Sequence, residues 1–355
     1  MIDNKIPVII CLSNTISGAV SWAFRLKYEF RNHPNYKIML LGRDVELEDQ
    51  EYDLILSVKG SNRYSAYDLL KKFPNAIIVP NWLWNLFPVC AKLKSKGNKI
   101  SCIGFCRSDN EYEYYNNLVK NEAFISHFVA VSPECGSALL KRIPHRVNDI
   151  SILPTGVFVP DILTRSYNTQ PIRIVYGGRI EQRQKRVMDF VPIVKILLAK
   201  KINFIFSIAG DGSYLLPLME AMRKCKHAGR VRFFGRLSSR EMIDVWREHD
   251  IFIQMSDFEG TSNSMLESMS QGTVPLVTTA SSGINGIIEH QKNGFTFPIG
   301  DVESMAETIN LLANEPKLLQ KVGEEAYQKA KLFSMDSYAK NFTSILDKLV
   351  QNSHL

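Results

Sequence analysis

The feature of this 355-residue sequence that most constrains its fold is a regular alternation of short apolar runs with longer amphipathic stretches. Each run has the length of a buried strand, and the residues between runs suffice for a helix. Such alternation is typical of parallel βαβ units. In the first half we expect a helix over residues 19–32 and strands at 8–12, 37–41, 53–57, 76–79, 100–104 and 128–131.

The alternation is interrupted once, between about residues 155 and 171, by a polar stretch that we interpret as a linker. After it we expect strands at 172–176, 204–209, 230–234, 251–254 and 274–278. Helices are expected at 185–201, 214–226, 239–248, 263–271, 302–314, 317–332 and 338–350.

The predicted fold class is therefore α/β, with two Rossmann-like domains that carry parallel sheets and face each other across a cleft. The expected boundaries are 1–155 for the first domain and 156–335 for the second. A C-terminal helix within 336–355 is expected to pack back on the first domain. In such sheets ligands bind beyond the carboxyl ends of the strands.

Composition and charge narrow the class of protein. Hydrophobic residues make up 45% and charged residues 22%, as in ordinary globular proteins. No segment approaches the roughly 20 apolar residues that span a bilayer, and the N-terminal segment lacks a secretory pattern. We expect a cytoplasmic protein, with a peripheral contact at the inner face of the membrane left open. The six cysteines match no zinc spacing, so we expect reduced and mostly buried thiols.

The net charge of +7 suits an anionic small molecule or a membrane surface. It is spread over both halves of the chain rather than concentrated in a tail, and no concentrated basic face is evident. A nucleic-acid partner is therefore not expected.

A first candidate binding motif is Gly177-Gly178-Arg179, directly after the predicted strand 172–176, with Lys185 six residues beyond the arginine. Glycines allow a sharp turn and a close approach of the backbone to a ligand. Arg179 and Lys185 can converge at the start of the next helix, where anions are favoured, and this suits a diphosphate. The alternative is a solvated basic loop, because other arginines lie alongside.

A second candidate motif runs from residue 257 to 267, after the predicted strand 251–254. Its loop can present backbone amides and hydroxyls at a helix N-terminus, which makes a second phosphate cradle. Glu259 precedes this helix and can point at a sugar, whereas Glu267 lies one turn inside and can accept hydrogen bonds from ribose hydroxyls. An ordinary capped helix is the alternative. The residues expected to line the cradle are Gly260, Thr261, Ser262 and Asn263.

Two weaker patterns bear on cofactors. Gly210 and Gly212 could begin a dinucleotide fingerprint, but Leu215 occupies the position of the third glycine. Asp257 and Glu259 could hold a metal, but no second carboxylate cluster accompanies them. We therefore expect no cofactor and no metal requirement.

Taken together, the two motifs resemble the donor site of glycosyltransferase family 4, retaining enzymes of the GT-B fold that include glycogen synthase-like and phosphatidylinositol mannosyltransferase-like proteins. The resemblance runs from about residue 103 to 338. Its matching segments are 152–157, 177–179 with Lys185, 209–212, 231–236, 259–267 and 286–294. It implies that Arg179 and Lys185 hold the donor phosphates, that Glu259 lies at the donor sugar, and that Glu267 lies at the ribose. Further donor contacts are implied for Gly178, Gly210, Gly212 and Arg236.

The N-terminal half departs more from the family pattern. Only Ser17-Gly18-Ala19 answers to the glycine-rich loop that often follows the first strand, and Gly18 is the donor-binding candidate there. Cys106 or Arg107 stands where the family often has a histidine, which puts that histidine's role in doubt. Asp109 is a candidate contact for the sugar or the acceptor, although a helix cap is equally consistent.

The resemblance implies a retaining, metal-independent glycosyltransferase that moves a sugar from a nucleotide-diphosphate sugar to a glycan, a lipid-linked molecule or another hydroxyl acceptor. Cell-surface polysaccharide or glycoconjugate biosynthesis is the expected setting. The alternatives are a nucleotide-sugar epimerase or hydrolase of the same architecture, and a catalytically inactive nucleotide-sugar-binding partner subunit.

Overall fold

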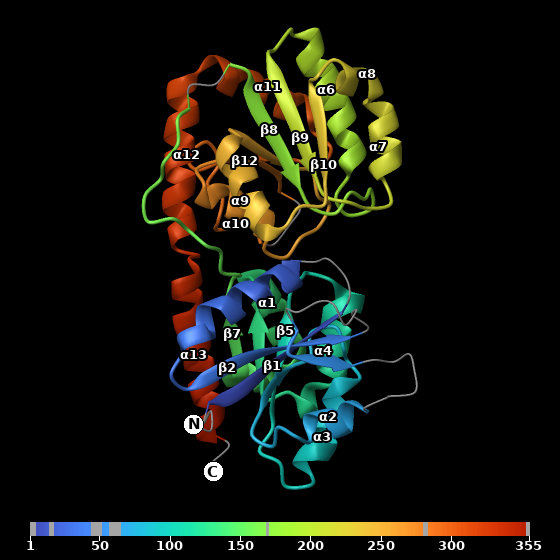
Figure 1. Cartoon of the computed structure of the whole chain (residues 1–355), viewed down its shortest axis with the longest axis vertical. Coiled ribbons are helices and arrows are strands. Elements are labelled where there is room, and N and C mark those ends of the chain that lie inside the picture. The colour runs from blue at the N-terminus through green and yellow to red at the C-terminus, as the bar shows by residue number, and fades with distance from the viewer. Residues whose placement is uncertain are drawn as a thin grey trace. The chain divides into compact units, whose positions relative to one another are not determined.

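The structure is a computed structural model that describes residues 5–13, 18–43, 52–56, 65–167, 170–279 and 283–352. Ser17, Ser57 and residues 168–169 of the predicted linker lie outside the described residues. The chain forms two compact units, one of residues 1–156 with 335–355 and one of residues 157–334. Each unit contains one parallel sheet with helices packed on it (Figure 1). The predicted α/β class with two parallel-sheet, Rossmann-like domains is confirmed.

The first unit is built on a sheet in the order β3-β2-β1-β4-β5-β6-β7, in which every neighbouring pair is parallel. Residues 8–12 of β1, an interior strand of this sheet, are fully buried. Burial on both faces explains why these strands are continuous apolar runs. The strands are β1 (Ile6–Ser13), β2 (Tyr36–Arg43), β3 (Leu54–Leu56), β4 (Ile77–Val79), β5 (Ser101–Cys106), β6 (His127–Ala130) and β7 (Ile150–Ile152).

Helices cover this sheet, and the last helix of the chain is one of them. The helices are α1 (Gly18–Glu29), α2 (Ala66–Leu70), α3 (Leu86–Lys94), α4 (Asn116–Lys120), α5 (Pro133–Arg142) and α13 (Met335–Asn352). Short 3₁₀ or π turns lie at Phe30–Asn32, Glu111–Tyr115, Glu122–Phe124 and Pro144–Asp149.

Helix α13 is held on the first unit by an aromatic cluster. Phe342 is fully buried, with ring centroids 5.9 Å from Tyr338, 6.3 Å from Phe105 and 6.5 Å from Trp22. A Cβ at Gly156 would lie 2.6 Å from the Cβ of Tyr338, so the chain passes this helix closely only because residue 156 is glycine. The helix is thus part of the core of the first unit.

The second unit has a six-stranded parallel sheet in the order β10-β9-β8-β11-β12-β13. Its strands are β8 (Ile172–Gly177), β9 (Phe204–Ala209), β10 (Val231–Gly235), β11 (Ile251–Gln254), β12 (Val274–Thr278) and β13 (Phe295–Phe297). Its helices are α6 (Phe190–Ala199), α7 (Leu215–Ala221), α8 (Arg223–His227), α9 (Ser239–Glu248), α10 (Asn263–Ser270), α11 (Val302–Asn314) and α12 (Pro316–Lys331).

The largest difference from the predicted elements is the start of the helix after β8. It was expected at Lys185, but α6 begins at Phe190 after a 3₁₀ turn, and Arg186 has a left-handed φ of 49°. The cause is Pro192, which has no amide hydrogen and whose ring clashes with the carbonyl four residues earlier. Pro192 is therefore tolerated only in the first turn of α6, and Lys185 lies in a loop.

Two edge strands escaped prediction. The strand at 128–131 was expected to close the first half, but β7 follows β6 at the edge of that sheet, and β13 forms an edge of the second sheet. Each has three residues, and none of the β7 residues is fully buried. A strand of three residues is too short to form an apolar run that periodicity can detect.

Replacement of Phe342 by alanine should lower the free energy of unfolding by about 3–5 kcal/mol, because it leaves a cavity between helix and sheet. The measurement is urea unfolding followed by tryptophan fluorescence. Asn341→Ala, one residue earlier on the exposed side of α13, is the matched control and should change stability by less than about 0.5 kcal/mol. Equal effects of the two substitutions would show that α13 does not belong to this core.

Candidate functional site

The loops that follow β8, β9 and β10 are joined by backbone hydrogen bonds at the carboxyl edge of the second sheet. The Gly178 amide donates to the Ala209 carbonyl at 3.0 Å, and the Gly210 amide donates to the Gly235 carbonyl at 2.7 Å. The Ile180 amide donates to the Asp211 carbonyl at 2.8 Å. Three separate loops therefore form one connected edge, which is where parallel sheets bind ligands.

Two glycines of the β9 loop make this contact possible. Gly210 has a φ of +135°, and a Cβ there would lie 1.9 Å from the carbonyl oxygen of Gly178. Gly212 has a φ of +157°, and its Cβ would lie 2.3 Å from the carbonyl oxygen of Ile180. Both distances are far below any real contact. The β9 loop thus reaches the β8 loop only with glycine at these positions.

Arg179 extends from the β8 loop with its side chain exposed. Its Nη2 donates to Oε1 of Gln184 at 2.5 Å, and Nε2 of Gln184 donates to the Phe258 carbonyl at 2.9 Å. Gln184 therefore links the arginine to the loop that follows β11. The Tyr176 hydroxyl donates to the Arg179 carbonyl at 2.6 Å. Burial raises the pKa of Tyr176 well above its usual value, and the negative charge of Glu259 raises it further, so the phenol stays a donor.

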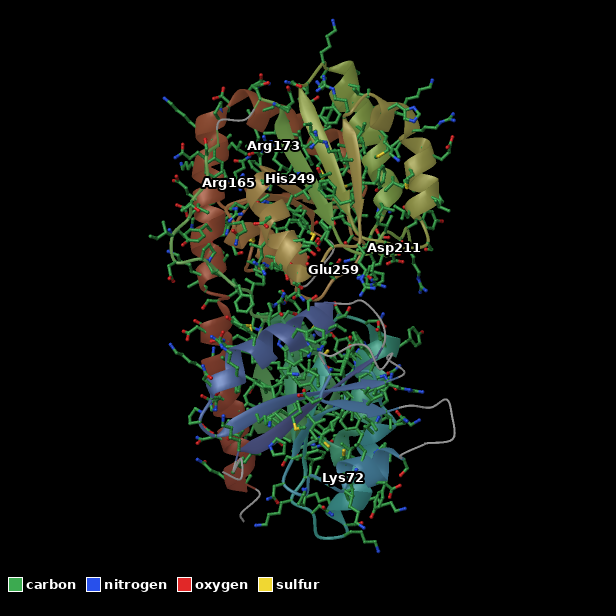
Figure 2. The ribbon with its side chains drawn as sticks, viewed as in Figure 1. Lys72, Arg165, Arg173, Asp211, His249 and Glu259 are labelled. Atoms are coloured by element: carbon green, nitrogen blue, oxygen red, sulfur yellow. The ribbon has the colours of Figure 1, made fainter. Side chains whose placement is uncertain are left out.

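Lys185 and Glu259 form an ion pair between Nζ and Oε1. The lysine side chain is 15% exposed and the glutamate side chain 10% exposed. The same carboxylate oxygen accepts a hydrogen bond from the Ser256 hydroxyl at 2.8 Å. One carboxylate and one ammonium are thus held in a mostly dry position, where electrostatic interactions are strong. Figure 2 shows Glu259 and Asp211 at the same edge of this unit.

The cradle residues lie where α10 begins. The Ser262 hydroxyl accepts a hydrogen bond from the Met265 amide at 3.3 Å, as an N-cap does, and donates to Oε1 of Gln254 at 2.6 Å. Gly260 is buried, and a Cβ at Gly283 would lie 1.7 Å from its carbonyl oxygen. Thr261 and Asn263 are half-buried beside it. Because the cap and Gln254 engage the Ser262 hydroxyl, its donor is not directed toward a ligand here.

The remaining predicted residues have different positions. Glu267 is half-buried one turn inside α10. Arg236 is exposed directly after β10. Gly18 and Asp109 belong to the first unit, where Gly18 begins α1 and Asp109 lies beyond β5. Oδ1 of Asp109 accepts a hydrogen bond from the Tyr115 hydroxyl at 2.9 Å, and the N-terminal cap next to it is Asn110.

Sequence reasoning missed several residues that organise this edge. Gln184 joins two loops, and Ser256 holds the Glu259 carboxylate. Arg186 donates to Asp189 at 2.7 Å and to Asp257 at 3.3 Å. Asp257 is therefore an ion-pair partner. Among the described residues, no group of three or more His, Cys, Asp or Glu side chains is placed to hold a metal ion. Sequence periodicity does not indicate the contacts of Gln184, Ser256 and Arg186, because each depends on a loop conformation.

A buried polar network lies at the starts of β11 and β12, away from the carboxyl edge that carries the site. Arg165 donates to Asp250 at 3.1 Å, to the His249 carbonyl at 2.8 Å and to the Gln271 carbonyl at 3.0 Å. Both charged side chains of this pair are at most 3% exposed. His249 itself contacts the Ser207 hydroxyl at 2.8 Å and the Val245 carbonyl at 2.6 Å. The network thus ties the segment that enters the second unit to the starts of β11 and β12.

Comparison with known proteins places this unit in a family context. Residues 165–329 match the family of glycosyl transferases group 1. The glycogen synthase of Mycobacterium tuberculosis is 26% identical over 183 residues, which cover 51% of this chain and 44% of the synthase. A lipopolysaccharide core biosynthesis glycosyltransferase, LpsE of Rhizobium meliloti, is 30% identical over 122 residues, which cover 34% of this chain and 35% of LpsE. The chain thus spans less than half the length of these curated relatives.

Solved structures extend the likeness to the whole chain. A TarM mutant of S. aureus, in complex with fondaparinux, alpha-GlcNAc-glycerol and UDP, superposes with a TM-score of 0.78 at 12% identity. The match covers 96% of this chain and 99% of TarM. At this identity the likeness concerns the fold, and it agrees with the expected GT-B architecture of two Rossmann-like domains. No helix among the described residues is long and apolar enough to cross a membrane.

The free energy of unfolding should fall as the pH drops from about 6.5 toward 4, because the buried side chain of His249 resists protonation in the folded protein. Burial lowers the pKa of His249 to about 4, helped by nearby Arg173 and Arg165. Between these pH values the unfolded chain binds a proton that folded His249 excludes. The contribution of this histidine to stability is therefore present above pH 6.5 and is lost as the pH falls toward 4. At pH 5 the loss from this group should be about 2 kcal/mol relative to pH 7.

The measurement is urea unfolding of the wild type and of His249→Asn at both pH values. The variant should lose this part of the pH dependence, whatever its stability at pH 7. His227→Asn, at the exposed end of α8, is the control and should keep the wild-type difference. A pH dependence that is unchanged in His249→Asn would contradict the prediction.

Proposed function

We propose that this protein is a glycosyltransferase that moves a sugar from a nucleotide-diphosphate sugar to a hydroxyl acceptor. One observation carries the proposal. Within the residues that match the glycosyl transferases group 1, the carboxyl edge of a parallel sheet brings Arg179, Lys185 and Glu259 to one glycine-lined surface. Cations beside a carboxylate suit a donor with a diphosphate at one end and a sugar at the other.

The proposed role of Arg179 and Lys185 is to hold the diphosphate and to stabilise the charge that grows on it as the sugar leaves. A guanidinium binds phosphate oxygens in a planar fork, and an ammonium acts as a point charge. Cations that are already in place lower the barrier because little reorganisation is needed during the reaction. We propose that they take the part that a divalent metal has in other transferases, so that no metal is required.

The proposed role of Glu259 is to contact the transferred sugar. Lys185 and Ser256 hold one carboxylate oxygen, Oε1, and this orients the group. A carboxylate near the anomeric carbon can accept hydrogen bonds from sugar hydroxyls and stabilise the positive charge that develops there. The Glu-x7-Glu spacing to Glu267 supports membership of family 4 and a retaining outcome.

The proposed contacts to the nucleotide follow the same edge. The donor would approach the backbone at Gly178, Gly210 and Gly212, in turns whose close packing depends on glycine at 210 and 212. Glu267 would accept hydrogen bonds from the ribose hydroxyls, and Arg236 would lie on the side of the base. The cradle at 260–263 would add the amides at the start of α10.

We further propose that the donor is a UDP-sugar and that the product is a cell-surface glycan. TarM was solved with UDP, fondaparinux and alpha-GlcNAc-glycerol, and LpsE is a lipopolysaccharide core biosynthesis glycosyltransferase. The acceptor that we propose is a glycan or a lipid-linked molecule, bound by the first unit at the edge that carries Gly18 and Asp109. A lipid-linked acceptor also favours a peripheral contact with a membrane.

Arg179→Ala should weaken binding of UDP about a hundredfold while leaving uridine binding nearly unchanged, because the side chain acts on the phosphates. Isothermal titration with UDP and uridine, in buffer that contains EDTA, measures both affinities. Arg183→Ala, an exposed arginine four residues on, is the matched control and should change neither. Equal losses for UDP and uridine would remove Arg179 from the phosphate site, and UDP binding that requires manganese would remove the metal-free proposal.

Glu259→Gln should lower turnover on the order of a hundredfold and leave UDP affinity within a fewfold of the wild type. Glutamine keeps an oxygen for Ser256 and Lys185, so folding is less disturbed than by alanine. The measurement is the rate of sugar transfer from UDP-α-sugars under saturating donor. Asp257→Asn is the control, because it removes a nearby charge outside the proposed sugar contact.

The same assay tests the stereochemistry. With a UDP-α-sugar donor the wild-type product should carry an α linkage, read from the anomeric coupling constant by NMR. A β linkage would place the enzyme among inverting transferases and would remove the proposed role of Glu259.

A further inference from the structure

One stretch of the first unit carries a local excess of positive charge that a count over each half of the chain does not reveal. Residues 65–100 contain six lysines and one aspartate but no arginine or glutamate, so their local net charge is +5. This stretch includes α2, β4 and α3. A local excess of this size creates a positive potential that attracts anionic partners.

The lysines gather at the ends of two neighbouring helices. Lys71 is the C-cap residue of α2, and Lys72 follows it in the turn. Figure 2 labels Lys72 at one end of the first unit. Lys92 and Lys94 lie in the last turn of α3, and two more follow before β5. Lys92 Nζ lies 5.1 Å from the centre of the Tyr67 ring on α2. We call this set the lysine face: Lys71, Lys72, Lys92, Lys94, Lys96 and Lys99, all of them exposed.

Five of the six lysines of the lysine face have no ion-pair partner among the described residues. Lys71, Lys92, Lys94, Lys96 and Lys99 form no salt bridge with any described carboxylate. The single acidic residue of the stretch, Asp68, accepts a hydrogen bond from Ser65 at 2.5 Å. Some lysines elsewhere are paired, as Lys200 is with Glu307 at 2.7 Å. The charge of these five lysines is therefore available to an anionic partner.

An apolar contact adjoins the lysine face. Lys94 and Phe124 line the same surface cavity of about 280 Å³, whose other walls include Cys90, Ile100 and Ile125. The Phe124 side chain is 40% exposed. An exposed aromatic ring beside a row of lysines is the combination by which proteins rest at the headgroup level of a bilayer.

The position of the face in the sheet supports a docking role. Residues 71–72 precede β4 and residues 94–99 precede β5, so the lysines lie toward the amino ends of these strands. Ligands of parallel sheets bind at the opposite, carboxyl ends. A surface bound to the lysine face leaves that edge of the first unit open to an acceptor.

We propose that the lysine face docks this protein on an anionic phospholipid surface. Each lysine close to such a surface contributes about fivefold in affinity, and the contribution is screened by salt. The attraction is reversible and strong because several lysines act together. The inference supplies the site for the membrane contact in the proposed function but does not depend on transferase activity.

The experiment is sedimentation of the full chain with vesicles of phosphatidylcholine, with and without phosphatidylglycerol, at low and high salt. The wild type should bind only the anionic vesicles and should be released by salt. A quadruple variant, Lys71→Gln, Lys94→Gln, Lys96→Gln and Lys99→Gln, should lose roughly 600-fold in affinity. Phe124→Ala should weaken binding without changing its salt dependence.

The matched control removes the same charge from exposed lysines of the second unit, by Lys195→Gln, Lys224→Gln, Lys226→Gln and Lys317→Gln. It should bind vesicles like the wild type, which separates a specific face from net charge. Equal losses in the two quadruple variants would overturn the proposal, as would equal binding to neutral vesicles. Binding to soluble polygalacturonate but not to vesicles would assign the face to an acidic glycan instead. UDP binding in each variant reports separately on the proposed function.

Discussion

The approach of Gly210 to the carbonyl oxygen of Gly178 is the constraint on which the candidate site depends. A Cβ at position 210 would lie 1.9 Å from that oxygen, so any other residue would push the β9 loop away from the β8 loop. Because the Gly178 amide bonds to Ala209 in the same place, the two loops share one conformation. The edge is thus organised before a ligand arrives, and binding does not have to order it.

The buried ion pair of Lys185 and Glu259 makes the two ends of the proposed donor interdependent. Either charge alone at this position would be costly, because little water reaches it. In the proposed complex a phosphate oxygen would share the Lys185 ammonium, and the Ser256 hydroxyl would continue to hold the carboxylate. Glu259 would then be freer to accept hydrogen bonds from a sugar. In the proposed complex, diphosphate binding and sugar contact would therefore be coupled through this ion pair.

The fold was largely predictable because buried parallel strands are apolar on both faces, as in Phe204–Ala209 and Ile251–Gln254. The start of α6 was not, because the expected helix at Lys185 overlooked Pro192. The glycine turns were visible in the sequence, since their role depends on the missing side chain itself. Gln184 was not, because its two hydrogen bonds join loops from different strands. Sequence pattern therefore indicates which loops bear the site, whereas the contacts between loops require the structure.

The two cationic features to which we assign roles differ in what surrounds them, and this difference separates those roles. Arg179 and Lys185 are held by a glutamine and a glutamate, which aim each donor and leave little freedom to lose on binding. Lys71, Lys94, Lys96 and Lys99 of the lysine face are exposed at or after helix ends, and the described residues offer them no carboxylate partner. Oriented cations discriminate one ligand geometry, whereas solvated cations respond to charge density. A small diphosphate suits the first arrangement, and an extended anionic surface suits the second.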